Sequence, residues 1–327
     1  MANDVISALQ QCGVALGVAP YSTAATSFTR GLIVSSYTAN PATQSVERVP
    51  EVRGTLGIPR VTKGPLDYEV SLGFPLDVST NNAAGLGDFL AALMGTDTGT
   101  VAGGVYTHKF TVSESSQPPY LNLYSTKDYV AKQIQGFRPT QIKFSFKSGD
   151  GFIPVEVSGK AQTESDLAAA QTLTFPAAPL IVPSNVTAFS VGGVAVTNFD
   201  TLDITLKNEQ EAFRPLSSSR NANEIYRKAW SVEIAMSGLN FPSETQRTAY
   251  RDVTPSAFLF TLTDSGGKTL SFVFPETYIP AFEGPNVGDQ DLQHINMTMM
   301  ATGTLANQYV ELKNTFTKNY STGASIV

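Results

Sequence analysis

The chain has 327 residues and a formal net charge of −6, from 22 Lys and Arg against 28 Asp and Glu. Its single cysteine, Cys12, excludes a disulfide framework and any multi-cysteine metal site. The acidic balance argues against a surface that holds nucleic acid, because such binding relies on basic side chains that displace counterions from phosphates.

The first half of the chain is predicted to be mostly β, with two helices. A short helix is expected from Asn3 to Ala15, and a long polar segment without a clear pattern covers Ser35–Arg60. In Asp67–Phe74 every second residue is apolar, which is typical of a half-buried antiparallel strand. Ala83–Met94 has apolar residues at helical spacing, with Gly95 as a stop signal. The alternating pattern also predicts strands at Tyr106–Val112, Gln141–Lys147 and Ile153–Ser158.

The second half has the same character. A helix is predicted from Ser243 to Val253, and two polar segments, Lys207–Lys228 and Leu305–Val327, have no clear pattern. We expect these segments, like Ser35–Arg60, to contact neighbouring subunits, since long irregular loops in compact domains are usually functional or disordered. Alternation predicts strands at Thr201–Lys207, Trp230–Met236, Phe258–Leu262, Leu270–Phe274 and His294–Met300.

The two halves resemble each other in two alternative registers. Gln141–Lys147 matches Thr201–Lys207 in hydrophobic phase, whereas a strand, proline and helix unit begins at Tyr68 and again at Trp230. The two registers are offset, so a duplication is indicated and its register stays open. The Ala- and Pro-rich segment Leu167–Pro183 is interpreted as a linker, which predicts domains at 1–178 and 179–327.

No run of about 18 apolar residues predicts a membrane span. Met1–Asp4 lacks the basic region that opens a secretory signal, so synthesis in a reducing cytoplasm is expected. Charged residues make up 15% of the chain, below the roughly 25% of a typical soluble domain. Such a surface suits a protein whose faces meet other protein.

Motifs for catalysis or cofactor binding are weak. His108 and His294 are the only histidines, and we interpret both as strand residues rather than parts of a triad or a zinc site. Ser265–Thr269 resembles the end of a phosphate-binding loop, but position 262 is a leucine, so we predict a hairpin turn. Gly284–Asp291 is interpreted as a solvated loop rather than a cation site. We therefore predict no enzyme, no metal and no cofactor.

The alternating strands carry acids on their polar faces. Glu69, Glu156 and Glu233 each project opposite the apolar side of a predicted strand. An ordinary solvated sheet face explains this pattern, and it gains a functional meaning only if the face lines a cavity or channel.

Segments throughout the chain resemble the tail tube proteins of long-tailed (siphovirus-type) bacteriophages. In the first half, the resemblance lies in Tyr68–Leu72, Tyr106–Phe110, Gly136–Ile142 and Val155–Gly159. In the second half, it lies in Phe199–Asn208, Phe274–Glu276 and Met300–Gly303, which are similar to the second domain of tail tube proteins with two tandem copies of the fold.

The resemblance implies a mainly β (α+β) fold of two tandem β-sandwich or barrel domains, each with a short flanking helix. Inner sheets of neighbouring domains would join into a β-barrel around a channel, and three chains would close a pseudo-hexameric ring. Such rings would stack around a tape-measure protein, with tail terminator and tail-tip proteins as further partners. DNA would pass through the lumen without specific binding. The protein would be part of the virion tail, assembled in the bacterial host cytoplasm.

The resemblance also assigns roles to residues. The candidates for the channel lining are Glu69, Glu156, Asp203 and Glu233, whose carboxylates would repel phosphates. Four lysines share their strand faces, Lys143, Lys147, Lys160 and Lys207, and cross-strand pairing would neutralise them. The candidates for ring stacking are Glu47, Arg48, Glu51, Arg53, Arg214 and Arg220, in the long polar segments.

An alternative hypothesis is a surface β-sandwich for adhesion or carbohydrate binding. In that case Tyr120, Tyr124 or Tyr129 would be exposed and would stack on sugars.

Overall fold

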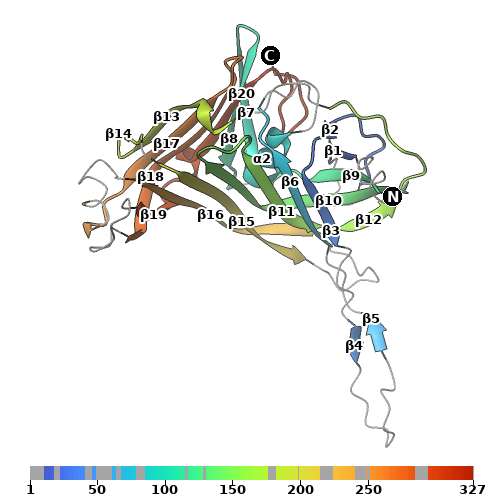
Figure 1. The fold of residues 1–327 in the computed structure, drawn as a ribbon. Helices are drawn as coiled ribbons and strands as arrows, with labels where there is room; N and C mark the ends of the chain where they lie inside the picture. The colour runs from blue at the N-terminus through green and yellow to red at the C-terminus, as the bar shows by residue number, and fades with distance from the viewer. Residues whose placement is uncertain are drawn as a thin grey trace, which may run out of the picture.

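The computed structural model describes residues 11–17, 23–40, 46–48, 61–63, 68–78, 85–114, 117–127, 130–175, 182–197, 199–213, 224–239, 248, 251–283 and 294–326. The chain is mostly antiparallel β, which confirms the predicted fold class (Figure 1). Among the described residues, no helix is long and apolar enough to cross a membrane.

One broad antiparallel sheet, here called the eight-stranded sheet, joins residues from both halves. In order of pairing its strands are β3 (Ser36–Asn40), β6 (Tyr68–Pro75), β11 (Pro154–Ala161), the C-terminal part of β10 (Val130–Lys147), β15 (Thr201–Phe213), β16 (Glu224–Leu239), β19 (His294–Ala301) and the C-terminal part of β18 (Thr269–Glu283). Within the described residues the pairing never returns from β18 to β3. The sheet is therefore open, with β3 and β18 as its edges.

The N-terminal parts of β10 and β18 belong to two further sheets. The first contains β2 (Gly31–Leu32), β1 (Cys12–Leu16), β9 (Leu121–Lys127), β10 and β12 (Thr163–Asp166). The second contains β14 (Val194–Ala195), β13 (Val186–Val191), β17 (Ser256–Thr263), β18, β20 (Tyr309–Asn314), β8 (Val105–Val112) and β7 (Gly95–Ala102).

The remaining elements are short. They are helix α2 (Leu86–Met94), the 3₁₀ turns η1 (Pro183–Asn185) and η2 (Leu305–Asn307), and a two-stranded ribbon of β4 (Val46–Arg48) and β5 (Val61–Lys63). The ribbon lies at the opposite end of the molecule from the hairpin of β7 and β8 (Figure 1).

The strand order occurs twice. The pairings among β1, β2, β3, β6, β9, β10, β11 and β12 recur among β13, β14, β15, β16, β17, β18, β19 and β20. In β10 the register shifts between Ile134 and Phe137 and again before Gln141. In β18 it shifts between Phe274 and Thr277 and again before Ala281, so adding 140 to each β10 number gives its β18 counterpart. The hairpin of β7 and β8 has no counterpart among the described strands of the second half.

This correspondence selects one of the two registers. The strand, proline and helix unit is right, because β6 and β16 occupy equivalent places, although Ser243–Val253 lies mostly outside the described residues; Thr248 and Arg251 are helical. The match of Gln141–Lys147 with Thr201–Lys207 is wrong as a repeat. These two segments instead pair with each other in antiparallel register.

The helix predictions are confirmed in part. Cys12–Leu16 is strand β1, so the expected N-terminal helix is wrong there, and its residues before position 11 lie outside the described part. Helix α2 begins at Leu86, because Gly85 has an extended backbone and its N–H donates to the Asp88 carboxylate. Gly95 ends the helix with a φ of 105°, in the region that favours glycine.

All three polar segments without a clear pattern contain strands. β15 continues past Lys207 to Phe213, and β16 begins at Glu224, so Lys207–Lys228 is largely a hairpin. Ser35–Arg60 contains β3 and β4, and the C-terminal segment contains η2 and β20.

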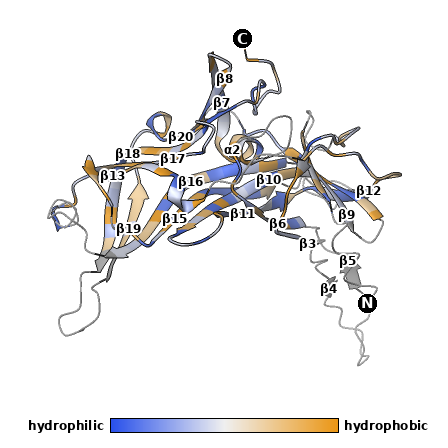
Figure 2. Cartoon of the chain, turned by 45° about the horizontal axis from the view of Figure 1, so that its top comes forward, coloured by the Kyte–Doolittle hydropathy of each residue, from blue (hydrophilic) through white to orange (hydrophobic). Residues whose placement is uncertain are grey.

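Aromatic side chains join the two halves into one core. Phe144 of β10 contacts Phe272 of β18 with ring centroids 4.9 Å apart, and Phe146 contacts Phe260 of β17 at 4.8 Å. Hydrophobic and hydrophilic residues alternate along the strands of the eight-stranded sheet (Figure 2). The alternation predicted from sequence therefore builds a sheet with one buried face and one polar face.

Arg227 of β16 holds the C-terminal end of helix α2. Its guanidinium donates to the carbonyls of Leu93 and Met94 at 2.9 and 2.8 Å and to Ser113 O at 2.5 Å. Burial, with the nearby Arg138 charge, lowers the pKa of Arg227 to about 10, so the side chain stays cationic at neutral pH. A cation at this position also complements the helix dipole.

Arg227→Met is expected to lower the free energy of unfolding by about 1–3 kcal/mol, because helix-end carbonyls would lose their donors. Chemical denaturation measures the loss. The matched control is Lys228→Met, whose exposed pair with Glu211 at 3.1 Å contributes at most about 1 kcal/mol. Equal losses for the two variants would contradict the capping role of Arg227.

Candidate functional site

The four predicted acids lie on the polar face of the eight-stranded sheet. Glu69 of β6 and Glu156 of β11 are exposed, and the side chains of Asp203 and Glu233 are 39% and 45% exposed. Their neighbours along each strand point to the opposite face and are buried, among them Leu72, Val157, Ile204 and Ile234. One continuous sheet thus brings all four acids to one surface, over residues that are far apart in sequence.

Each acid has a lysine next to it on this face. Lys207 Nζ lies 2.7 Å from Glu233 Oε2, and Lys143 Nζ lies 3.0 Å from Asp203 Oδ2. The remaining acids have a lysine directly opposite in the strand register, Lys160 for Glu69 and Lys143 for Glu156. The face is therefore a lattice of opposite charges rather than an acidic surface.

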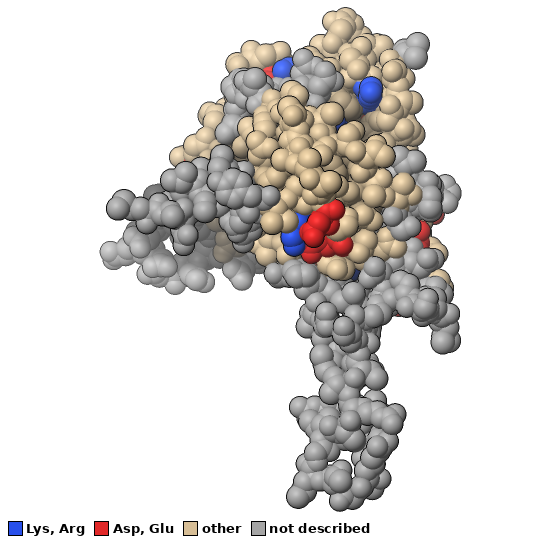
Figure 3. All heavy atoms as spheres, turned by 90° about the vertical axis from the view of Figure 1, so that its right-hand side faces the viewer, with Lys and Arg blue, Asp and Glu red and all other residues tan. Residues whose placement is uncertain are grey.

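The charges of these acids and of the lysines that share their strand faces cancel. The four acids and the four lysines Lys143, Lys147, Lys160 and Lys207 sum to zero formal charge. Because these pairs are partly exposed, each contributes only about 0.2–1 kcal/mol to folding, so stability alone gives little reason for the lattice. On the side of the molecule in Figure 3, most of the described surface carries neither basic nor acidic side chains.

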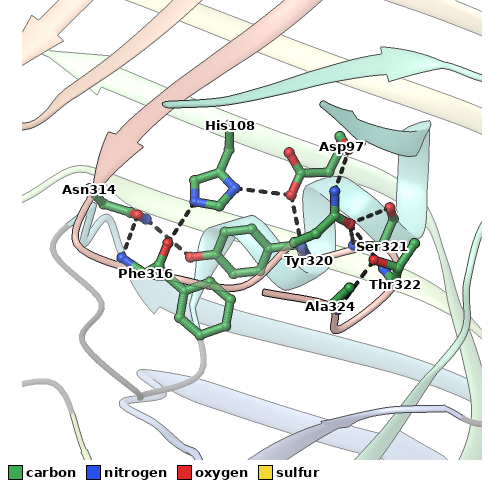
Figure 4. A network of polar contacts seen from close by, with 9 residues as sticks. Asp97, His108, Asn314, Phe316, Tyr320, Ser321, Thr322 and Ala324 are labelled. Carbon is green, nitrogen blue, oxygen red and sulfur yellow. Dashed lines mark hydrogen bonds and ion pairs between the residues drawn. The ribbon is translucent and has the colours of Figure 1, made fainter. Parts of the chain in front are cut away.

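His108 takes part in a buried network instead of a catalytic arrangement (Figure 4). Its Nδ1 lies 2.9 Å from Asp97 Oδ2 and its Nε2 lies 3.0 Å from the Phe316 carbonyl oxygen, and the imidazole is fully buried. Both contacts are to oxygen atoms that can accept a hydrogen bond from the imidazole. Asp97 Oδ2 also accepts the Tyr320 N–H at 2.8 Å. The network fastens the C-terminal segment to β7 and β8, and the imidazole contacts Asp97, Phe316 and Tyr320 among the described residues rather than a serine or cysteine nucleophile.

The other motifs are accounted for structurally. Ser265–Thr269 forms the turn between β17 and β18, as predicted, with Asp264 Oδ1 accepting two backbone N–H groups at 2.8 Å. Gly284–Asp291 and the His294 side chain lie outside the described residues. In the part of the chain that the structure describes, no three His, Cys, Asp or Glu side chains gather as metal ligands would.

The ring-stacking candidates fall outside the described side chains. Glu47 and Arg48 are described only as backbone of β4, and Glu51, Arg53, Arg214 and Arg220 lie in undescribed segments. Nothing in sequence signalled the role of Arg227 or of Asn208, which donates to Leu93 O at 2.9 Å, because both look like ordinary polar surface residues.

Two of the three tyrosines suggested for sugar stacking are buried. Tyr120 is 6% exposed and Tyr124 is fully buried, while Tyr129 lies outside the described residues. The expectation that Tyr120 and Tyr124 are exposed is wrong, because Tyr120 packs against Ile225 of β16 and Tyr124 packs with Phe28 and with Ala131 of β10.

The family comparison agrees with this architecture. Residues 13–309 match the phage tail tube protein family. The chain belongs to this family. As a phage tail tube protein it is a structural component of the virion tail, in a family whose subunits assemble into a tube. A comparison with curated proteins gives no match.

Proposed function

We propose that the chain is the major tail tube subunit of a long-tailed, siphovirus-type phage. Three chains form a pseudo-hexameric ring, in which each chain contributes its eight-stranded sheet to a closed barrel. The rings stack around a tape-measure protein, between a tail-tip and a terminator protein, and the tube forms in the host cytoplasm. It conducts DNA during ejection and carries no catalytic role.

The observation that carries this proposal is the open eight-stranded sheet. One face is packed by the core and the other is polar, and both edges are unpaired within the described residues. Unpaired edges invite association, and closure into a barrel is the arrangement that removes them. Closing the sheet with its buried face outward turns the polar lattice toward the lumen.

The repeated strand order supports the domain division. We propose tandem tail tube domains at 1–178 and 179–327, since the first strand set ends with β12 at Asp166 and the second begins with β13 at Val186. The ribbon of β4 and β5 lies at one end of the molecule, so rings that stack head to tail bring it to the next ring (Figure 1). We assign ring stacking to Glu47, Arg48, Glu51, Arg53, Arg214 and Arg220 on the two long hairpin segments.

The charge lattice gives the proposed lumen its chemistry. Phosphates gain little from a lysine that a neighbouring carboxylate already neutralises, so DNA slides past Lys143, Lys160 and Lys207 without being retained. Glu69, Glu156, Asp203 and Glu233 are the proposed lining acids. Their role is to neutralise the lysines and to repel phosphate.

Charge reversal on this face is expected to slow DNA ejection. Glu69→Lys with Glu233→Lys changes the sum of the eight charges from zero to +4, because each substitution adds two, while the exposed positions leave folding and assembly intact. The measurement is the ejection rate of virions carrying the variant, with tail length checked by electron microscopy.

The matched control exchanges partners without changing net charge. Glu69→Lys with Lys160→Glu, and Glu233→Lys with Lys207→Glu, keep the sum of these eight charges at zero and are expected to eject at the unmodified rate. If the reversed and exchanged variants eject equally fast, this face does not line the DNA path.

A further inference from the structure

The two edges of the eight-stranded sheet are long stretches of unpaired backbone. Residues 36–40 of β3 pair only with β6, and residues 278–283 of β18 pair only with β19, within the described part of the chain. Edges of this kind can each accept a strand from another chain. The question is which strand, and in which register.

The chain contains an internal example of such a junction. β10 of the first strand set pairs with β15 of the second over seven residue pairs, from Gln141 opposite Lys207 to Lys147 opposite Thr201. Its buried side brings Phe144 opposite Ile204, and its polar side carries the Lys143–Asp203 ion pair. We call this the β10–β15 seam.

The repeat converts the internal seam into a prediction about the edges. β18 is the counterpart of β10, and β3 is the counterpart of β15, so the two free edges are the two strand types that the seam already joins. The strand registers give the equivalent positions, which are Gln141 and Ala281, Ser158 and Thr298, Ser71 and Ala235, and Thr38 and Asp203.

One residue pair fixes the register between chains. Lys143 lies opposite Thr205 in the β10–β15 seam. Lys143 follows Gln141 by two residues, so its counterpart in β18 is Glu283, which follows Ala281 by two. Thr205 follows Asp203 by two residues, so its counterpart in β3 is Asn40, which follows Thr38 by two. We propose that β18 of one chain pairs antiparallel with β3 of a second copy, with Glu283 opposite Asn40.

This inference rests on the proposed tube function and specifies its subunit contact. The contact joins unlike edges, so it propagates from chain to chain and closes when the accumulated rotation completes a ring. Because the seam between chains repeats the seam within the chain, the barrel would carry equivalent junctions all the way around.

A disulfide tests the register in the full chain. With Asn40→Cys and Glu283→Cys, assembly under reducing conditions followed by oxidation is expected to crosslink neighbouring chains, because directly opposite residues have Cβ atoms about 4.5–5.5 Å apart. Covalent products on a non-reducing gel should stop at three chains. Native Cys12 does not compete, since it is buried and burial raises the pKa of its thiol to about 12.

Two matched pairs calibrate the result. Lys143→Cys with Thr205→Cys has the same geometry within one chain and should form an intrachain disulfide. Thr38→Cys with Glu283→Cys is displaced by two residues, so its Cα atoms would be about 7–8 Å apart and the crosslink should be lost. Preferential crosslinking of the displaced pair would overturn the proposed register.

Hydrogen exchange of the unmodified chain gives a test without substitutions. The amides of residues 36–40 and 281–283 that lack partners in the monomer should become protected on assembly. Tubes in which both edges exchange as fast as in the monomer would overturn this contact while leaving the tube function standing. A chain that forms no tubes under any condition would count against the proposed function itself.

Discussion

Replacing His108 by phenylalanine is expected to lower the free energy of unfolding by about 3–5 kcal/mol. The imidazole and the Asp97 carboxylate are both fully buried, with His108 Nδ1 2.9 Å from Asp97 Oδ2, and His108 Nε2 lies 3.0 Å from Phe316 O. Removing the ring leaves the buried carboxylate with one donor fewer and the buried Phe316 carbonyl without this donor. Both groups stay shielded from water, so the lost hydrogen bonds are not replaced. Urea denaturation followed by circular dichroism measures the loss.

The control for His108 is an exposed ion pair. Lys132→Met removes the Lys132–Glu164 contact, whose lysine side chain is 43% exposed, and should cost no more than about 1 kcal/mol. Replacing both buried partners, with Asp97→Leu added to His108→Phe, should recover part of the loss because no charge then remains unpaired. A loss below about 1 kcal/mol for His108→Phe would contradict the network's role.

The same substitution is expected to free the C-terminal segment. The Tyr320 ring packs against Gly87 of helix α2 so closely that a Cβ atom at position 87 would collide with it. The guanidinium carbon of Arg30 lies 4.7 Å from the centroid of the Phe316 ring. Limited proteolysis should cut His108→Phe within residues 315–326 faster than the unmodified chain. Through these contacts the polar C-terminal segment packs against its own chain. Its expected contacts with neighbouring subunits stay a prediction.

Phe272→Ala is expected to destabilise both halves together, by about 3–5 kcal/mol. The ring is fully buried and contacts Phe144 at 4.9 Å, Phe146 at 6.4 Å and Phe260 at 6.4 Å, so its removal leaves a cavity between β10 and β18. Because the core is continuous, thermal unfolding should remain a single transition that shifts to lower temperature.

Phe213→Ala serves as the surface control for Phe272→Ala. The Phe213 side chain is 47% exposed and contacts Tyr226 on the outside of the hairpin of β15 and β16, so its loss should cost under about 1 kcal/mol. Two separate transitions in Phe272→Ala, with only one shifted, would contradict a shared core.

In the eight-stranded sheet, β3 and the C-terminal part of β18 lie outside the predicted strands, whereas the other six strands could be predicted from sequence, because burial of one face enforces period-2 alternation. The extension of β15 beyond Lys207 could not, since Asn208, Glu209 and Gln210 are all polar. Asn208 is nevertheless fully buried, because its side-chain amide donates to Leu93 O of helix α2. The hydropathy of the sequence gives no sign of a hydrogen-bond partner so far away in the chain. The N-terminal helix prediction failed for a similar reason: β1 is specified by its pairing with β9 rather than by a local pattern.

The register of the duplication shows the same limit. Gln141–Lys147 and Thr201–Lys207 share a hydrophobic phase because both cover the same core, side by side, and not because they are equivalent. The positions that reveal the repeat are the register shifts before Gln141 and Ala281, which arise from backbone pairing. Each acid was predicted on the polar side of its own strand. The ion pairs of Asp203 with Lys143 and of Glu233 with Lys207 depend on strand neighbours that sequence order does not give.

The central claim is that this chain closes its eight-stranded sheet into a hollow tube. Electron microscopy of the purified full chain, compared at low and high concentration, tests it most directly. We predict hollow tubes or stacked rings of constant diameter, with threefold end-on averages and the polar face of the sheet toward the lumen. Compact single particles at every concentration, or tubes whose lumen is lined by another surface, would contradict the claim.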